Sequence, residues 1–229
     1  MAGKAIAWPA AVFPKSAMFH PDSQSKSGGL SMTGSEQLTV SNAGRWRASL
    51  TAPIMTEESV LSWRAFVSMM EGRAGTCLVP KWERYGVRNL NGREFDQQPI
   101  AEYGDDSLNF DLSGFGQSDD IVHAQMAVPA ALGATRLSVI INDGAGPRPG
   151  QYIGIGDRLY MVQLAWELVE GGPLQVQVWP RLRAAAVMGE RVILDRPVCL
   201  MRFATDQTGE LSLDMGRWGT PGLELIEAI

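Results

Sequence analysis

The side chains that most often act as bases, nucleophiles and metal ligands are scarce in this sequence. It has two histidines, His20 and His123, and two cysteines, Cys77 and Cys199. Neither histidine has carboxylates or cysteines at the spacing of metal ligands, and the cysteines form no CxxC motif. Both cysteines fall in apolar segments, which favours buried thiols. We therefore expect no metal site, and no cysteine within hydrogen-bond reach of a histidine.

Two further features resemble binding motifs, but neither has the residues that such a motif needs. The glycine-rich run at 144–150 lacks a lysine followed by serine or threonine, and its prolines remove amide donors that a phosphate loop would use. The acidic pairs at 105–106 and 119–120 could attract calcium, but the register of a calcium-binding loop is absent. No GxSxG motif marks a nucleophilic serine. The sequence therefore predicts no catalytic, cofactor-binding or metal-binding residues, and no enzyme.

Composition bounds the class of protein. The chain has 229 residues, 45% of them hydrophobic and 20% charged, which is enough to build a core and excludes global disorder. The net charge of −5 argues against sequence-specific nucleic-acid binding, which usually shows a basic footprint. No apolar run reaches the roughly 18 residues of a membrane span, and the start carries no signal-peptide pattern. We expect synthesis in the cytosol and no membrane partner.

The first half of the chain predicts an arm, a strand and one helix. Residues 1–36 are interrupted by prolines and predict an extended N-terminal arm, ordered against a neighbour. Residues 45–54 alternate between apolar and polar side chains, which predicts a strand with one buried face. The following helix is predicted over 56–71, with Thr56 as its N-cap and Gly72 at its end. The stretch from 83 to about 120 is polar and predicts mostly loop.

The second half predicts a small β-domain. Glycine (25) and proline (13) punctuate the chain often, which suits short strands joined by turns. Dense β-patterns begin near residue 122 and suggest a small barrel or sandwich. A last β-segment is predicted over 191–203. The strands expected in the domain are 122–128, 136–142, 151–155, 158–168 and 174–180.

Six residues are candidates for contacts between subunits. Seven tryptophans are more than a core of this size requires, and tryptophan is enriched among the residues that dominate protein interfaces. Two arginines on the polar face of the 45–54 strand are either solvated or paired with acidic groups of another subunit. The interface candidates are Trp8, Arg45, Trp46, Arg47, Trp82 and Trp218.

A set of motifs in two segments resembles a known family. In residues 44–75, GRWRASLTAPIM runs into the helix TEESVLSWRAFVSMMEGRAG, which contains the W-x-x-F element Trp63 and Phe66 and ends at Gly72. In the second segment, a P-x-L-R element precedes a glycine turn and a proline-led strand, at Pro180, Leu182, Arg183, Gly189, Pro197, Met201 and Arg202. This pattern resembles the distal tail, or tail-tip (baseplate), structural proteins of long-tailed bacteriophages with non-contractile tails. The resemblance covers residues 35–80 and 150–205.

The resemblance implies a fold and a domain layout. It implies a mainly β protein, with a tail-tube-like β-sandwich flanked by one helix and a second small β-barrel or sandwich domain. After the arm at 1–36, residues 37–105 and 187–229 would build the ring-forming domain. Residues 106–186 would be an inserted β-domain.

The resemblance also implies a function in the virion. Such a protein is a structural component of the tail tip, forming a ring that joins the tail tube to the distal hub and leaves a lumen for DNA. Its partners would be its own copies, as a hexamer or else a trimer, together with the tail tube protein and the hub or tape-measure proteins.

Two other functions stay open at this stage. A carbohydrate-binding module would present aromatic side chains from the middle domain, with Tyr152, Tyr160, Trp166 and Trp179 as candidates. A cell-wall hydrolase carried by a tail would use a Cys–His pair or zinc ligands. Only His20, His123, Cys77 and Cys199 are available for such a site.

Overall fold

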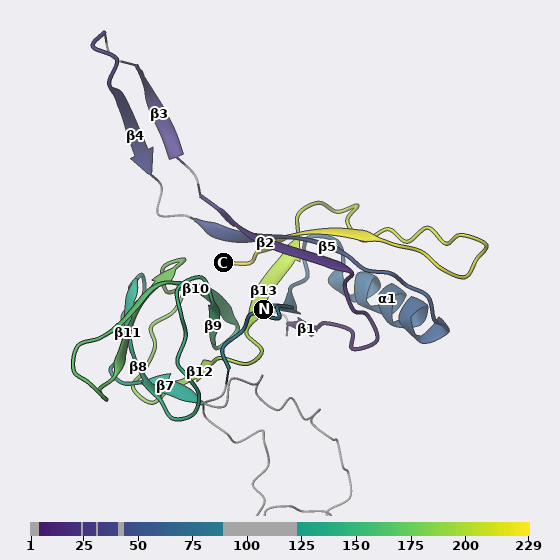
Figure 1. The fold of residues 1–229 in the computed structure, drawn as a ribbon. Helices are drawn as coiled ribbons and strands as arrows, with labels where there is room; N and C mark the ends of the chain where they lie inside the picture. Colours follow the sequence, from purple (N-terminus) through teal and green to yellow (C-terminus); the bar gives the residue numbers. More distant parts are fainter. Residues whose placement is uncertain (1–4, 24, 31, 41–43, 89–122) are drawn as a thin grey trace, which may run out of the picture. The chain divides into compact units, whose positions relative to one another are not determined.

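The chain folds into two compact units, which we call the sheet unit and the barrel unit (Figure 1). The computed structural model describes residues 5–23, 25–30, 32–40, 44–88 and 123–229. The sheet unit comprises residues 1–82 and 198–229, and the barrel unit comprises residues 83–197. Both ends of the chain therefore belong to the sheet unit, and the barrel unit is inserted within it.

The sheet unit is built on one six-stranded sheet in the order β1-β6-β13-β14-β5-β2. β1 runs parallel to β6, and the other neighbouring pairs are antiparallel. Two strands on either side of the insertion are direct neighbours, since Pro80 of β6 pairs with Val198 of β13. The strands are β1 (Ile6–Ala7), β2 (Ser16–Asp22), β5 (Arg45–Thr51), β6 (Cys77–Pro80), β13 (Val198–Phe203) and β14 (Gly222–Glu227).

β5 is a strand with one face in the core, as its alternating sequence predicts. Trp46, Ala48 and Leu50 are buried, whereas the intervening Arg45, Arg47, Ser49 and Thr51 are partly exposed. The register places Ala48 between Phe19 of β2 and Leu225 of β14, and both of these side chains are buried. The core face therefore continues across three strands that are far apart in the sequence.

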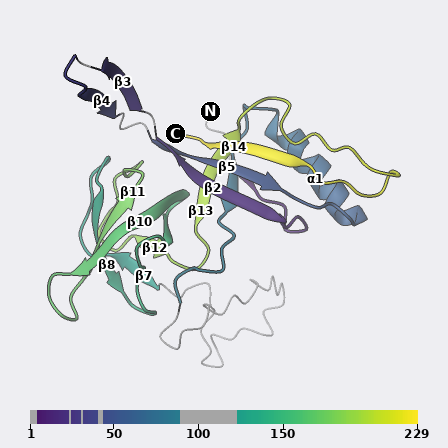
Figure 2. The ribbon, with the colours of Figure 1, turned by 45° about the horizontal axis from the view of Figure 1, so that its top comes forward.

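The predicted helix is also present, as α1 (Glu57–Met70), and lies against one face of the sheet (Figure 2). Thr56 caps its N-terminus, because the Thr56 hydroxyl accepts a hydrogen bond from the Ser59 amide while the Ser59 hydroxyl accepts one from the Thr56 amide. Trp63 and Phe66 are buried, and the Phe66 ring centroid lies 6.2 Å from that of Phe203 in β13. The helix ends at Met70, and its C-cap residue Glu71 adopts the left-handed conformation just before Gly72.

A β-hairpin of β3 (Ser25–Leu30) and β4 (Glu36–Val40) forms a separate two-stranded sheet. It falls partly within the stretch 1–36, where the sequence predicts an extended arm. The described part of that stretch is extended, but it is organised into β1, β2 and β3. The sequence did not predict the strand β2 because it contains Pro21. Proline is tolerated in a strand mainly at a sheet edge, and β2 is an edge strand.

The barrel unit is a closed six-stranded antiparallel barrel in the order β10-β11-β8-β7-β12-β9. Inward-facing side chains such as Val139, Ile153, Val162 and Val176 fill its interior. Its strands are β7 (Ala124–Met126), β8 (Arg136–Ile141), β9 (Tyr152–Ile155), β10 (Arg158–Glu167), β11 (Leu174–Trp179) and β12 (Arg191–Ile193).

The predicted mainly β class with one helix is thus confirmed, together with a small barrel among the predicted alternatives. The segment predicted as one strand over 191–203 is two strands in different units: β12 closes the barrel, and β13 belongs to the six-stranded sheet. The structure divides the chain at 82/83 and 197/198, whereas the sequence placed these boundaries at 105/106 and 186/187. The first of those expected boundaries, and most of the predicted loop at 83–120, lie outside the described residues.

Candidate functional site

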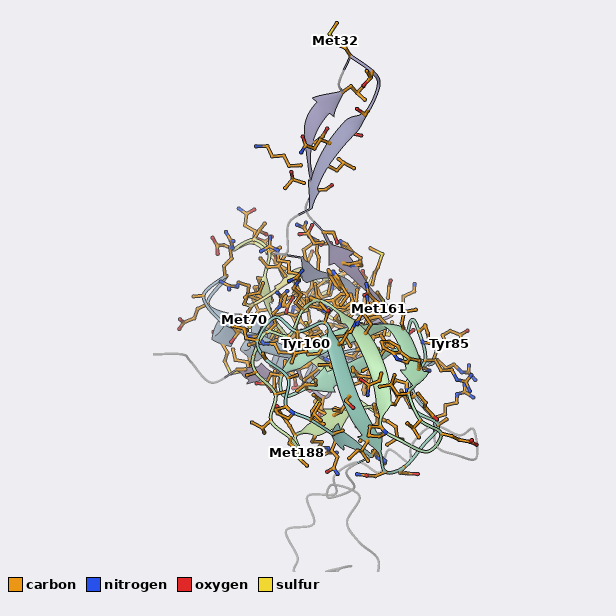
Figure 3. The ribbon with its side chains drawn as sticks, turned by 90° about the vertical axis from the view of Figure 1, so that its left-hand side faces the viewer. Met32, Met70, Tyr85, Tyr160, Met161 and Met188 are labelled. Atoms are coloured by element: carbon orange, nitrogen blue, oxygen red, sulfur yellow. The ribbon has the colours of Figure 1, made fainter. Side chains whose placement is uncertain are left out.

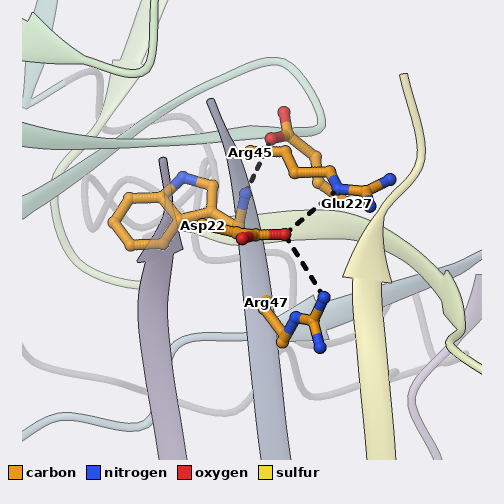
Figure 4. Close-up of polar contacts among 5 residues, drawn as sticks. Asp22, Arg45, Arg47 and Glu227 are labelled. Atoms are coloured by element: carbon orange, nitrogen blue, oxygen red, sulfur yellow. Dashed lines mark hydrogen bonds and ion pairs between the residues drawn. The ribbon is translucent and has the colours of Figure 1, made fainter. Parts of the chain in front are cut away.

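Trp46 is a core residue, which corrects its choice as a surface candidate. Its side chain is 0% exposed on the inner face of β5. Its backbone amide donates a hydrogen bond of 3.0 Å to Oε2 of Glu227, which is itself buried (Figure 4). This residue therefore stabilises the sheet unit from within and offers no surface to a partner.

Arg45 and Arg47 are paired within their own chain. Arg45 Nε lies 3.6 Å from Asp22 Oδ2, and an Arg47 Nη2 contact to the same oxygen measures 3.3 Å (Figure 4). Asp22 is the last residue of β2, so one carboxylate holds two arginines across the β2–β5 pair. Because all three side chains are partly exposed, solvent screens these ion pairs and their contribution to stability is small.

Trp8 and Trp82 belong to an aromatic cluster around α1. The Trp8 ring centroid lies 5.1 Å from Trp82, 5.4 Å from Phe66 and 6.3 Å from Trp63. The Trp8 indole also donates a hydrogen bond of 2.7 Å to the Val12 carbonyl. Both Trp8 and Trp82 are half-buried. Through these contacts the N-terminal segment packs against the helix.

Trp218 is the most exposed of the four candidate tryptophans, with an exposed fraction of 45%. It lies in a tight turn closed by pairing between Asp214 and Trp218, and Met215 in that turn is 88% exposed with a left-handed φ of 50°. Exposed Met55 follows Ile54, whose backbone pairs with Gly219, and it therefore neighbours Trp218 in the antiparallel register. We call Met55, Met215 and Trp218 the tip patch.

The β3–β4 hairpin is a second exposed surface, which sequence reasoning missed. Every side chain of β3 is exposed, and so are residues 32–39. Its exposed apolar residues are Leu30, Leu38 and, in the connecting turn, Met32, which Figure 3 labels at the far end of the hairpin. The available sequence signal was the polar Gly-Ser stretch ahead of EQLTV, which predicts a loop as readily as a hairpin.

Two of the chemically reactive side chains lie in the sheet-unit core. Cys77 and Cys199 are both fully buried, on β6 and β13. Burial raises the pKa of the Cys77 thiol to about 12, which keeps it protonated, whereas a nucleophilic cysteine needs a lowered pKa. His20 lies on the opposite side of β2 from the buried Phe19.

His123 lies in the barrel unit and has a carboxylate partner that the sequence did not suggest. Its Nδ1 lies 3.2 Å from Asp143 Oδ2, and the His123 carbonyl accepts hydrogen bonds from the amides of Asn142 and Asp143. These contacts fix a turn next to β7 and β8. Among the described residues, no group of three or more His, Cys, Asp or Glu side chains could hold a metal ion.

The four aromatic residues considered for sugar binding do not share one face. Tyr160 is 2% exposed inside the barrel, where its hydroxyl accepts a hydrogen bond of 3.1 Å from the Arg183 amide. Tyr152, Trp166 and Trp179 are half-buried on the outside of the barrel. Burial, followed by the nearby Glu83 carboxylate, raises the pKa of Tyr152.

No family model matches the chain, and no curated protein matches it. In the part of the chain that the structure describes, none of the helices is both long and apolar enough to cross a membrane.

Proposed function

We propose that this protein is a structural component of a phage tail tip, which forms a ring between the tail tube and the distal hub and leaves a lumen for DNA. The observation that carries the proposal is the β3–β4 hairpin, whose strands pair only with each other among the described strands. Its side chains are exposed along its length, so nothing within the described chain gives it a core.

A hairpin of this kind gains its stability from a partner. An isolated two-stranded hairpin is marginally stable in water, and its open edges and apolar side chains are suited to pairing with another chain. Leu30, Met32 and Leu38 supply the apolar contacts for such a partner. Glycine and serine dominate β3, so backbone pairing would contribute much of the contact.

The tip patch supplies a second, different surface. Tryptophan and methionine are enriched at interfaces, and Met215 is 88% exposed in the turn that ends at Trp218. A ring of identical subunits needs two different surfaces on each subunit, because its contacts are head-to-tail and close by rotation. The hairpin and the tip patch of the sheet unit meet this requirement.

The proposal includes the finer architecture of the tail-tip family. In it, the sheet unit is the tail-tube-like, ring-forming domain with sandwich packing, and the barrel unit is the inserted outer domain. The six-stranded sheet with its flanking helix and the closed barrel support this assignment. The partners are six copies of this chain, or else three, with the tail tube and hub or tape-measure proteins, in the virion after assembly in the host cytoplasm.

The test is the oligomeric state of the full chain as its concentration rises, measured by native mass spectrometry and negative-stain imaging. We expect a closed six-subunit or three-subunit ring with an open centre. A variant in which residues 26–39 are replaced by a short glycine-serine turn should stay monomeric. Leu132→Ser, which changes an exposed residue of the barrel unit, is the matched control and should assemble as the parent does.

Three results would contradict the proposal: a monomer at every concentration, a twofold dimer without a central opening, or a ring that forms equally well without the hairpin. Thermal unfolding of the hairpin variant would confirm that the rest of the sheet unit remains folded.

A further inference from the structure

The outer face of three barrel strands carries an ordered set of polar side chains. In β11, Val176 and Val178 point into the barrel, so Gln175 and Gln177 point outward. Gln175 pairs with Ser138 of β8 on one side and with Trp166 of β10 on the other. These three residues therefore form one row across the outside of the barrel.

A second row runs beside the first. Gln177 pairs with Arg136 of β8 and with Leu164 of β10, whose side chains are exposed. Gln163, where the β10–β11 register shifts, adds a further exposed amide next to this row. Arg136 is the one charged residue in the two rows, so the surface is polar but nearly uncharged.

The amides are held in place by hydrogen bonds that leave other atoms available. Gln175 Nε2 donates to Ser138 Oγ at 2.8 Å, and Gln177 Nε2 donates to Gln163 Oε1 at 3.1 Å. Each side-chain amide has two N–H donors and an oxygen that accepts two bonds. Gln175 Nε2 also donates to the Pro173 carbonyl at 3.5 Å. The side-chain carbonyl oxygens of Gln175 and Gln177, together with the second N–H of Gln177, can therefore bind a ligand that both donates and accepts.

Tryptophans stand at both ends of this surface. Trp166 lies in the first row, and Trp179 lies four residues along β11 from Gln175 on the same outward side. Four residues of a strand span roughly 13 Å. Both indoles are half-buried, so part of each ring faces solvent. Met161, labelled in Figure 3, pairs with Trp179 and points to the side of β10 opposite Tyr160.

We propose that this surface, which we call the amide face, binds a pyranose oligosaccharide. It consists of Ser138, Gln163, Trp166, Gln175, Gln177 and Trp179. A pyranose ring offers an apolar C–H face that stacks on an indole, and hydroxyls that donate and accept at once, as a glutamine amide does. A surface with one arginine and no carboxylate in its two rows suits a neutral sugar better than a protein partner of either charge. This binding activity is separate from ring assembly and does not depend on it.

The test is direct binding by the full chain, using cello-oligosaccharides, chito-oligosaccharides and oligogalacturonates as probes. Intrinsic tryptophan fluorescence and affinity electrophoresis should show saturable binding of a neutral probe. Trp166→Ala should weaken that binding at least about tenfold, as expected when an aromatic contact is lost. Gln177→Ala should weaken it by a factor of about two to ten, the range for one hydrogen bond.

Phe13→Ala, which removes an exposed aromatic ring from the sheet unit, is the matched control and should bind as the parent does. Trp166→Phe should recover part of the affinity, because it retains an aromatic ring. If Trp166→Ala fails to fold, Gln177→Ala decides the outcome, since its side chain lies on the outer surface. The proposal is wrong if no probe binds at millimolar concentration, if only oligogalacturonates bind through Arg136, or if both amide-face variants bind as the parent does.

Discussion

The six-stranded sheet and the six-stranded barrel bury their apolar side chains in different ways. In the barrel every strand has two neighbours, and the inward-facing residues of its strands form the core. The sheet ends at β1 and β2, and its inner face is covered by α1 and the Trp8 segment. A closed barrel therefore leaves its outer face available for a ligand, whereas an open sheet has edges that must be protected or paired.

Neither edge strand of the six-stranded sheet is well suited to pairing with another chain. β1 has two residues, and β2 carries Pro21, both of which limit accidental pairing with other chains. The β3–β4 hairpin has no such protection. In our proposals, assembly uses the hairpin and the tip patch, and ligand binding uses the barrel.

The largest effect on stability should follow from removing one large side chain from the core of one unit while the core of the other unit is unchanged. Trp46→Ala removes a fully buried indole from the sheet unit and should lower its free energy of unfolding by about 3–5 kcal/mol. Ile153→Ala, in the barrel core, should lower only the barrel transition, by about 2–5 kcal/mol. Calorimetry should resolve two transitions that respond separately. A single transition lowered equally by both changes would show that the units unfold together.

The next largest difference between the units should appear at alkaline pH, where the sheet unit should begin to lose stability at a lower pH than the barrel unit. The pKa of Cys77 rises from 9.0 to about 12 on folding, so the unfolded state loses the thiol proton first and stability falls from about pH 9 toward pH 12. Three pKa units correspond to about 4 kcal/mol. In the barrel, the raised pKa of Tyr152 gives a loss that begins only near its ordinary value of 10.0. Urea unfolding at stepped pH measures both.

Cys77→Ala is the control for this pH dependence. It should remove the loss of sheet-unit stability that begins near pH 9, at the cost of a lower stability at neutral pH. An unchanged alkaline slope in this variant would rule out Cys77 as the source.

A smaller effect is expected at the start of α1. Thr56→Ala removes the hydroxyl that accepts from the Ser59 amide and should lower sheet-unit stability by about 1 kcal/mol. Thr56→Ser keeps an acceptor and should retain most of that stability. Chemical denaturation followed by circular dichroism checks both variants, and the barrel transition should not move. Equal losses in the two variants would mean that the cap is not the cause.

Local patterns predicted the elements but not their partners. The alternation in β5, the cap of α1 and the strands β8 to β11 could be predicted, because each depends on nearby residues. The separation of β12 from β13 could not, since it depends on which distant strand each one joins. Trp8 shows the same limit: its neighbours Trp63, Phe66 and Trp82 come from segments brought together by the fold.

The candidate surfaces follow this rule as well. Trp218 became an interface candidate because of a surplus of tryptophans, but Trp46 fits the same argument and is buried. The sequence did not indicate Met215 and Met55, because their exposure depends on the turn at 214–218 and on the pairing of Gly219 with Ile54. The amide face requires the barrel register, which aligns Ser138, Gln175 and Trp166 from three strands.

The neighbouring positions of Pro80 and Val198 have a consequence for synthesis of the chain. β6 leaves the ribosome long before β13, so the sheet cannot be completed until the whole insertion has been translated. A domain that folds as a unit on emerging brings its two ends together. Folding of the barrel then replaces a long, flexible loop by a short one, which lowers the entropic cost of joining β13 to β6. Folding of the insertion thus favours the pairing of β13 with β6, after which β14 can join β13 to β5.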